Sequence, residues 1–105
     1  MEQKEKPTYN GWANYQTWVV NLWLMNEQPS YNYWAERTRA VLRGTEPGDD
    51  RSEAVRKLAD ELREVVQEEC AIDEACLASD LMTASLEEVD WREIAVSFVE
   101  DFAPA

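Results

Sequence analysis

The sequence predicts an all-α fold, a compact single-domain bundle of about five helices around a Trp-rich first helix. Two observations favour this fold class: apolar residues recur at spacings of three and four, and residue types that begin or end helices flank the periodic segments. A chain of 105 residues, 45% of them hydrophobic, is long enough for one core. We therefore expect a single acidic helical domain over residues 9–105, preceded by a flexible segment over residues 1–8.

The first helix is predicted to begin after Asn14, a residue type that often caps helix N-termini. Apolar residues then occur on nearly every face, so this helix is expected at the centre of the core. Pro29 is expected to break the helix, and Ser30 to open a second helix that ends at Gly44. The outer side of this second helix is predicted to carry Arg37, Arg39 and Arg43.

The third helix is predicted over residues 51–69, after a turn-forming linker at residues 45–49. Asp50 and Glu53 form a D-x-x-E pattern that resembles a capping box. Two compensating charge pairs are expected on this helix, Glu53 with Lys57 and Arg56 with Asp60. A regular apolar stripe supports the helix and consists of Val55, Leu58, Ala59, Leu62, Val65 and Val66.

Two further helices complete the predicted bundle. A short one is expected over residues 73–84, with Ser85 as another possible helix start. Asp90 and Glu93 repeat the D-x-x-E pattern before a last amphipathic helix, which Pro104 is expected to stop. The residues expected to point inward from the short helix are Cys76, Leu77, Leu81 and Met82.

The charge of the chain is concentrated in its second part. Residues 46–105 contain 18 Asp and Glu against 5 Arg and Lys, whereas residues 1–45 contain 4 against 5. Such a field repels nucleic acid and anionic membranes and attracts cationic surfaces. A high net charge also keeps a small protein soluble. The segregation of the charge nevertheless favours a binding role for the acidic part.

An acidic column is predicted on the third helix. Asp60, Glu64 and Glu68 recur at i, i+4 and i+8, about 6 Å apart along a helix axis, with Glu61 beside them. This spacing is of the order of the distance between successive phosphates of one nucleic-acid strand. Like charges at this spacing do not stabilise a helix. The candidate partner-binding residues are Asp60, Glu61, Glu64, Glu68, Asp73, Glu74, Asp80, Glu87 and Glu88.

Catalytic and cofactor chemistry find no support in the sequence. The chain has no His, no nucleophile elbow and no phosphate-binding glycine motif, so we expect a non-enzymatic protein without a cofactor. Cys70 and Cys76 do not match zinc frameworks; a disulfide is conceivable, but two small buried apolar residues are favoured. The longest apolar stretch, residues 18–25, is too short to cross a bilayer, and no secretory signal is evident. We expect a cytoplasmic protein.

The aromatic residues are expected mainly in the core. Tyr9 and Trp12, which precede the first helix, are the most plausible exposed exceptions. The five tryptophans are expected in the core and not in a ligand cage, with Trp12 as the possible exception: Trp12, Trp18, Trp23, Trp34 and Trp91.

A family resemblance is carried by residues 11–18, which read G-W-A-N-Y-Q-T-W, and continues through Leu22-Trp23, Asn26 and Tyr33-Trp34. These residues resemble a family of small acidic proteins encoded by phages, plasmids and other bacterial mobile elements. The family has no established activity, so the resemblance implies a genetic setting and no catalytic residues. Small acidic proteins from such elements often resemble DNA mimics that disarm host restriction or CRISPR systems.

The resulting hypothesis is an inhibitor that occupies the basic DNA- or RNA-binding surface of a host defence complex in the bacterial cytoplasm. One alternative is a small helical adaptor or dimerisation module that uses an apolar or aromatic surface, with Tyr9 and Trp12 as candidates. A third possibility is direct nucleic-acid binding through the arginine-bearing side of the second helix.

Overall fold

Five α-helices make up the part of the chain that the computed structural model describes, residues 8–46 and 48–103, which confirms the all-α fold. The flexible segment expected at residues 1–8 lies outside these ranges except for its last residue, and so does Pro104. Beyond the helices, these ranges contain one isolated bridge between Tyr9 and Trp12. The helices are α1 (Tyr15–Asn26), α2 (Gln28–Val41), α3 (Ser52–Glu69), α4 (Leu77–Glu87) and α5 (Trp91–Phe102).

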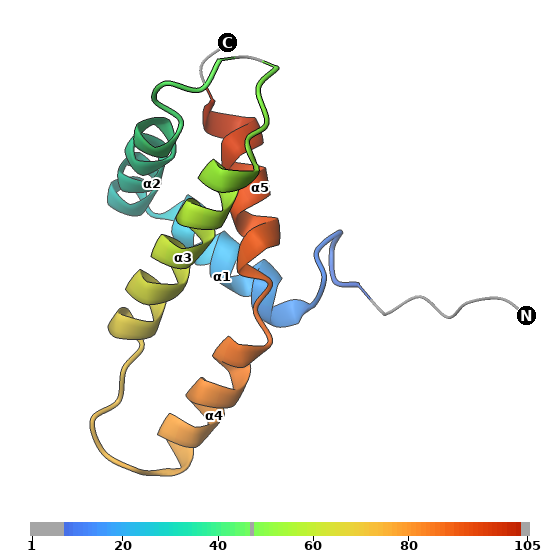
Figure 1. Cartoon of the computed structure of the whole chain (residues 1–105). Coiled ribbons are helices and arrows are strands. Elements are labelled where there is room, and N and C mark those ends of the chain that lie inside the picture. The colour runs from blue at the N-terminus through green and yellow to red at the C-terminus, as the bar shows by residue number, and fades with distance from the viewer. Residues whose placement is uncertain (1–7, 47, 104–105) are drawn as a thin grey trace, which may run out of the picture.

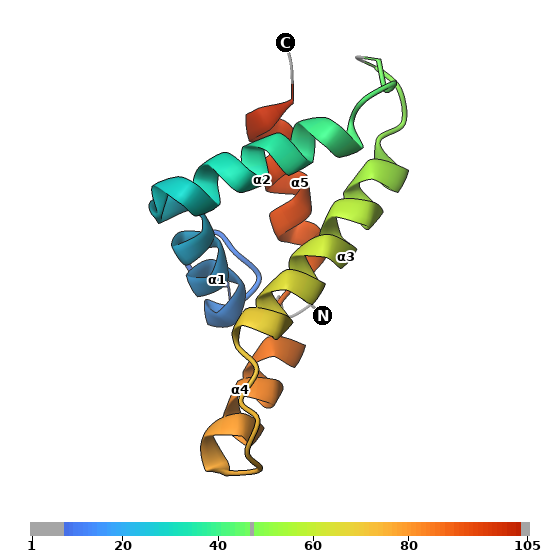
Figure 2. The same ribbon diagram turned by 90° about the vertical axis from the view of Figure 1, so that its left-hand side faces the viewer.

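The core lies between α3, α5 and α2. Figures 1 and 2 show α5 beside α3, with α2 across their upper part. The apolar stripe of α3 faces α5, and Leu58 and Leu62 are completely buried together with Ile94 and Phe98. Trp34 supplies the largest side chain from α2 and is also buried. The predicted stripe of α3 is therefore the centre of the bundle.

The first helix lies at the side of the bundle, which corrects the expectation that the other helices surround it. Only Thr17 and Leu24 of α1 are buried, and Trp23 is 65% exposed. The physical reason is the distribution of apolar residues on each helix. The segregated stripes of α3 and α5 can be buried fully against each other. Helix α1 packs on α2 and α5, and these two helices do not cover the side of α1 that carries Trp23.

The starts of α2 and α3 differ from the sequence expectation. Helix α2 begins at Gln28, and Pro29 lies in its first turn, where a backbone N–H would have no partner within the helix. The extended residue Glu27, and not Pro29, separates α1 from α2. At the start of α3, Asp50 accepts hydrogen bonds from the backbone N–H and the hydroxyl of Ser52 (2.9 and 2.6 Å). The capping box expected between Asp50 and Glu53 therefore does not form.

Helix α4 begins four residues later than expected and buries none of its side chains. The backbone N–H of Cys76 donates to the Ser79 hydroxyl (3.0 Å), so a local cap defines the start, and Ser85 lies within the helix. Leu77 and Leu81, expected to point inward, are 75% and 58% exposed. Figures 1 and 2 both show α4 beyond the lower ends of α1 and α3, where no other helix covers it.

Candidate functional site

Residues 64–90 form what we call the acidic arm: the last turns of α3, the loop at 70–76, α4, and the connection to α5 (Figure 1). This segment contains nine Asp and Glu and no Arg or Lys. It therefore supplies most of the formal net charge of −12. The arm projects from the bundle, so its charges face solvent from several sides.

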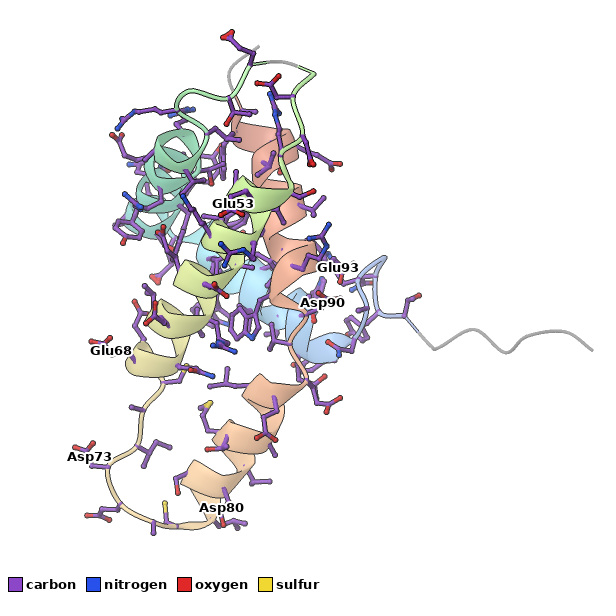
Figure 3. All side chains as sticks on the ribbon, viewed as in Figure 1. Glu53, Glu68, Asp73, Asp80, Asp90 and Glu93 are labelled. Atoms are coloured by element: carbon purple, nitrogen blue, oxygen red, sulfur yellow. The ribbon has the colours of Figure 1, made fainter. Side chains whose placement is uncertain are left out.

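Seven of the nine candidate partner-binding residues lie on the acidic arm and are exposed. Figure 3 shows Glu68, Asp73 and Asp80 pointing away from the bundle, from the end of α3 to the start of α4. The carboxylates therefore follow the outside of the arm instead of forming one flat face. The seven residues are Glu64, Glu68, Asp73, Glu74, Asp80, Glu87 and Glu88.

Glu61 does not belong to this surface. Its carboxylate accepts two hydrogen bonds from Arg37, each 2.9 Å long, and this bidentate ion pair joins α2 to α3. The hydrogen bond to Glu61 raises the pKa of Arg37. Arg37 is neutralised in this way. Of the three arginines expected on the second helix, only Arg39 in α2 and Arg43, just after its end, are exposed and without a salt bridge among the described residues.

Asp60 lies next to the acidic arm, in the part of α3 where acidic side chains are still paired with an arginine. Arg56 contacts the carboxylate of Glu53 at 2.8 Å and that of Asp60 at 3.5 Å. The expected pairing of Arg56 with Asp60 is thus present, but the described partner of Glu53 is Arg56 and not Lys57. The hydrogen bond from Arg56 lowers the pKa of Glu53. Beyond residue 63, the carboxylates of the acidic arm have no salt bridge among the described residues.

The acidic arm is held to the bundle by hydrogen bonds between the starts of α1 and α5. Asn14 Oδ1 accepts from the backbone N–H of Thr17 (2.8 Å) and from its hydroxyl (2.7 Å), which confirms the predicted cap. Asn14 Nδ2 donates to the carbonyl oxygen of Glu88 (2.6 Å). The Thr17 hydroxyl oxygen, fully buried, accepts from the backbone N–H of Asp90 (2.8 Å).

A second pair of bonds completes this contact, which we call the helix-start clamp: Asn14, Thr17, Asp90 and Glu93. Asp90 Oδ1 accepts from the backbone N–H of Glu93 (3.0 Å), as expected for a cap of α5. Glu93 Oε1 accepts from the backbone N–H of Ala13 (2.9 Å). Figure 3 shows Asp90 and Glu93 beside the start of α1. These carboxylates are structural, and sequence reasoning identified their caps but not their long-range partners.

The turn before α1 also has a structural explanation. Asn10 and Gly11 both have positive φ angles (49° and 86°), and Tyr9 and Trp12 exchange two backbone hydrogen bonds of 2.8 Å. This is the geometry of a two-residue type I′ turn, for which Asn-Gly is a preferred sequence. The Asn-Gly dipeptide was the sequence signal for it. The motif at residues 11–18 therefore serves to place α1 against α5.

The tryptophans divide into buried and exposed residues. Trp34 is buried as expected, and Trp91 is partly buried against the core. Trp12 also packs against the core, so its expected exposure is wrong, whereas Tyr9 is exposed as expected. Trp23 contradicts the expectation of a core position because most of its side chain faces solvent.

The two cysteines are free and lie in different surroundings. Cys70 is partly buried, and burial, followed by the nearby Glu69 charge, raises its pKa. Cys76 is exposed, which corrects the expectation of two buried thiols. A hydrogen bond from the backbone N–H of Ser79 lowers the pKa of Cys76.

Within residues 8–46 and 48–103, every helix is too short or too polar to cross a membrane. In the same part of the chain, no three His, Cys, Asp or Glu side chains gather where they could hold a metal ion.

A model of a protein family matches residues 5–100, and its description is "Family of unknown function (DUF7249)". No curated protein and no solved structure matches the chain.

Proposed function

The chain belongs to the family of unknown function DUF7249, and on this premise we propose that it is a non-catalytic binding protein whose acidic arm mimics DNA. The arm occupies the basic nucleic-acid-binding surface of a partner protein. The observation that carries this proposal is the run of nine acidic and no basic side chains over residues 64–90. A surface of this kind accelerates encounter with basic partners.

The arrangement of the arm supports the proposal in two ways. Its carboxylates, apart from that of Asp90, which caps α5, are exposed and free of ion pairs among the described residues, so their charge is available to a partner. The arm also projects beyond the bundle (Figure 2), so it can reach into a nucleic-acid-binding cleft without steric interference from α2 or α5. Charge neutralised within the bundle, as in the pair of Arg37 and Glu61, does not contribute.

The proposed setting is a phage, plasmid or other mobile element, and the proposed target is a host defence complex of the CRISPR or restriction type. The resemblance of residues 11–18 to small acidic proteins of such elements supports this setting. In this role the protein acts in the cytoplasm of the host bacterium and competes with DNA or RNA for the target.

The test is capture of partners from a bacterial lysate, followed by release with duplex DNA. The arm variant is Glu64→Lys with Glu68→Lys, and the control is Glu100→Lys with Asp101→Lys, which makes the same change in net charge on α5. We expect a captured nucleic-acid-binding protein that DNA or high salt releases. The arm variant should weaken capture by about tenfold or more, and the control should not. Capture that survives the arm reversal and excess DNA contradicts the proposal.

A second candidate function, an adaptor that joins a larger assembly, is favoured by the exposure of Trp23 and Leu77. Its original candidates fit less well, because Trp12 packs against the core and Tyr9 packs on Tyr15 and Trp18. Capture that is insensitive to salt and is lost in Trp23→Ala would select the adaptor. Retardation of labelled DNA or RNA by the protein alone would instead select direct nucleic-acid binding.

A further inference from the structure

Three adjoining cavities open on the side of the molecule where α1, α3 and α4 meet. The first, of about 490 Å³, lies between α1, α2 and the end of α3 and includes Tyr33. The second, of about 500 Å³, lies between α1, the end of α3 and α4 and includes Val19. The third, of about 370 Å³, lies between the loop at 70–76 and α4 and includes Ile72.

Shared lining residues place these three cavities next to one another, and together we call them the apolar trough. Trp23 and Leu24 line both the first and the second cavity. Cys70, Met82 and Leu86 line both the second and the third. Because Trp23 is mostly exposed, it stands at the boundary of two cavities as an accessible aromatic anchor.

The charge around the trough has one sign. Its lining includes three carboxylates, Glu27, Glu69 and Glu87, and no Arg or Lys. All three residues are exposed and fully available to a partner. An apolar floor with an acidic rim is complementary to an apolar stripe flanked by basic side chains.

We propose that the apolar trough binds an amphipathic, basic helix of a partner protein. Three cavities in a row suit the apolar residues that a helix presents at i, i+3 or i+4, and i+7. Lys and Arg on the flanks of that helix then face Glu27, Glu69 and Glu87. A second copy of this chain is a poor occupant, because its net charge of −12 opposes the acidic rim.

This inference goes beyond the mimicry of DNA. The DNA mimic rests on the outward carboxylates of the acidic arm, such as Glu64 and Asp73, which do not line the trough, whereas Glu69 and Glu87 of the arm also stand at the trough rim. The trough uses the opposite, inner side of the arm together with α1. Glu64→Lys with Glu68→Lys therefore changes the acidic arm without changing the trough lining, and Trp23→Ala changes the trough without changing the arm.

The test uses designed, fluorescently labelled helical peptides of about five turns. The first has Leu at i, i+4 and i+7 and Lys on both flanks; the second has Glu in place of Lys; the third has the composition of the first with its Leu residues distributed around the helix. Fluorescence anisotropy measures the dissociation constants. We expect the first peptide to bind about tenfold or more tightly than either of the others.

Trp23→Ala identifies the binding surface. We expect this change to weaken binding of the first peptide by about tenfold or more. The control is Tyr31→Ala, which removes a partly exposed aromatic ring outside the trough, where Tyr31 packs on Phe102 (5.2 Å between ring centroids). Thermal melting checks that both variants remain folded. Equal binding by the parent protein and Trp23→Ala would overturn the proposal.

The two thiols supply an independent measurement. Cys70 lines the trough and Cys76 does not, so bound peptide should slow alkylation of Cys70 and leave that of Cys76 unchanged. The proposal is overturned if the third peptide binds as tightly as the first, because charge attraction alone would then explain binding. It is also overturned if sedimentation shows a dimer that Trp23→Ala dissociates, because a second copy would then occupy the trough. Neither result affects the test of DNA mimicry, in which duplex DNA releases the captured partner from the acidic arm.

Discussion

Helices α4 and α5 have similar lengths and similar caps, but only α5 is buried in the core. They are 11 and 12 residues long, and each begins at a cap that involves the residue three positions later. Yet no side chain of α4 is buried, whereas α5 buries Ile94, Ala95, Phe98, Val99 and Phe102. The comparison teaches that formation of a helix and contribution to the core are separate properties in this chain.

The difference arises from what each helix meets. Helix α5 lies along the apolar stripe of α3, while the loop at 70–76 carries α4 past the end of that stripe (Figure 1). Charge follows the same division. The bundle pairs Arg37 with Glu61, and the acidic arm leaves its carboxylates free. We infer that the bundle provides stability and the arm provides recognition, and the following changes test this division.

The largest effect is expected from truncation in the bundle. Phe98 is completely buried between Trp34 and Phe102, with ring centroids 6.3 and 5.6 Å away. Phe98→Ala should lower the free energy of unfolding by about 3–5 kcal/mol. Leu81→Ala in the arm should change it by less than about 0.5 kcal/mol. Urea denaturation measures both, and a large loss from Leu81→Ala would show that α4 belongs to the core.

A smaller effect is expected at the helix-start clamp, where the arm is attached to the bundle. Thr17→Val keeps the side-chain shape but leaves the backbone N–H of Asp90 without its acceptor, at a cost of about 1–3 kcal/mol. The control is Thr38→Val, whose hydroxyl donates only to the Trp34 carbonyl in its own helix, and it should cost about 0.5 kcal/mol. If thermal melts show the same loss of stability for Thr17→Val and Thr38→Val, the hydrogen bond between Thr17 and Asp90 contributes nothing specific to the helix-start clamp.

Neutralising a single carboxylate should lower the free energy of unfolding slightly in the bundle and not at all in the acidic arm. Glu61→Gln removes a partly exposed ion pair between α2 and α3 and should cost about 0.2–1 kcal/mol, less at high salt. Glu68→Gln, in the arm, should produce no measurable loss because Glu68 has no ion-pair partner among the described residues. Urea titrations at low and high salt compare the two, and a greater cost for Glu68→Gln would contradict the division.

The smallest expected effect is a difference in the pH dependence of alkylation between the two thiols at the ends of the loop at 70–76. The pKa of Cys76 is lowered and that of Cys70 is raised, so Cys76 should reach half-maximal alkylation at a lower pH than Cys70. Mass spectrometry of iodoacetamide-treated protein across a pH series measures both profiles. Coinciding profiles would show that the loop exposes both thiols equally.

Local features were the ones that sequence reasoning recovered. The stripe of α3 and the caps at Asn14 and Asp90 depend on residues within one or two helical turns, and all of them are present in the structure. The position of α1 could not be recovered in the same way. A helix that is apolar all round does not indicate which side is covered, so the exposure of Trp23 had no local signal.

The sequence by itself determined that this protein is helical, that α1 and α5 begin after the caps Asn14 and Asp90, and that its negative charge is concentrated over residues 64–90. These properties follow from periodicity, capping and composition, which act over a few residues. Tertiary structure alone decided that Glu61 pairs with Arg37, 24 residues away, and that Thr17 holds Asp90, 73 residues away. It also decided that α4 remains uncovered beside the apolar trough. These outcomes depend on which helices meet in space, and local spacing in the sequence carries no record of that.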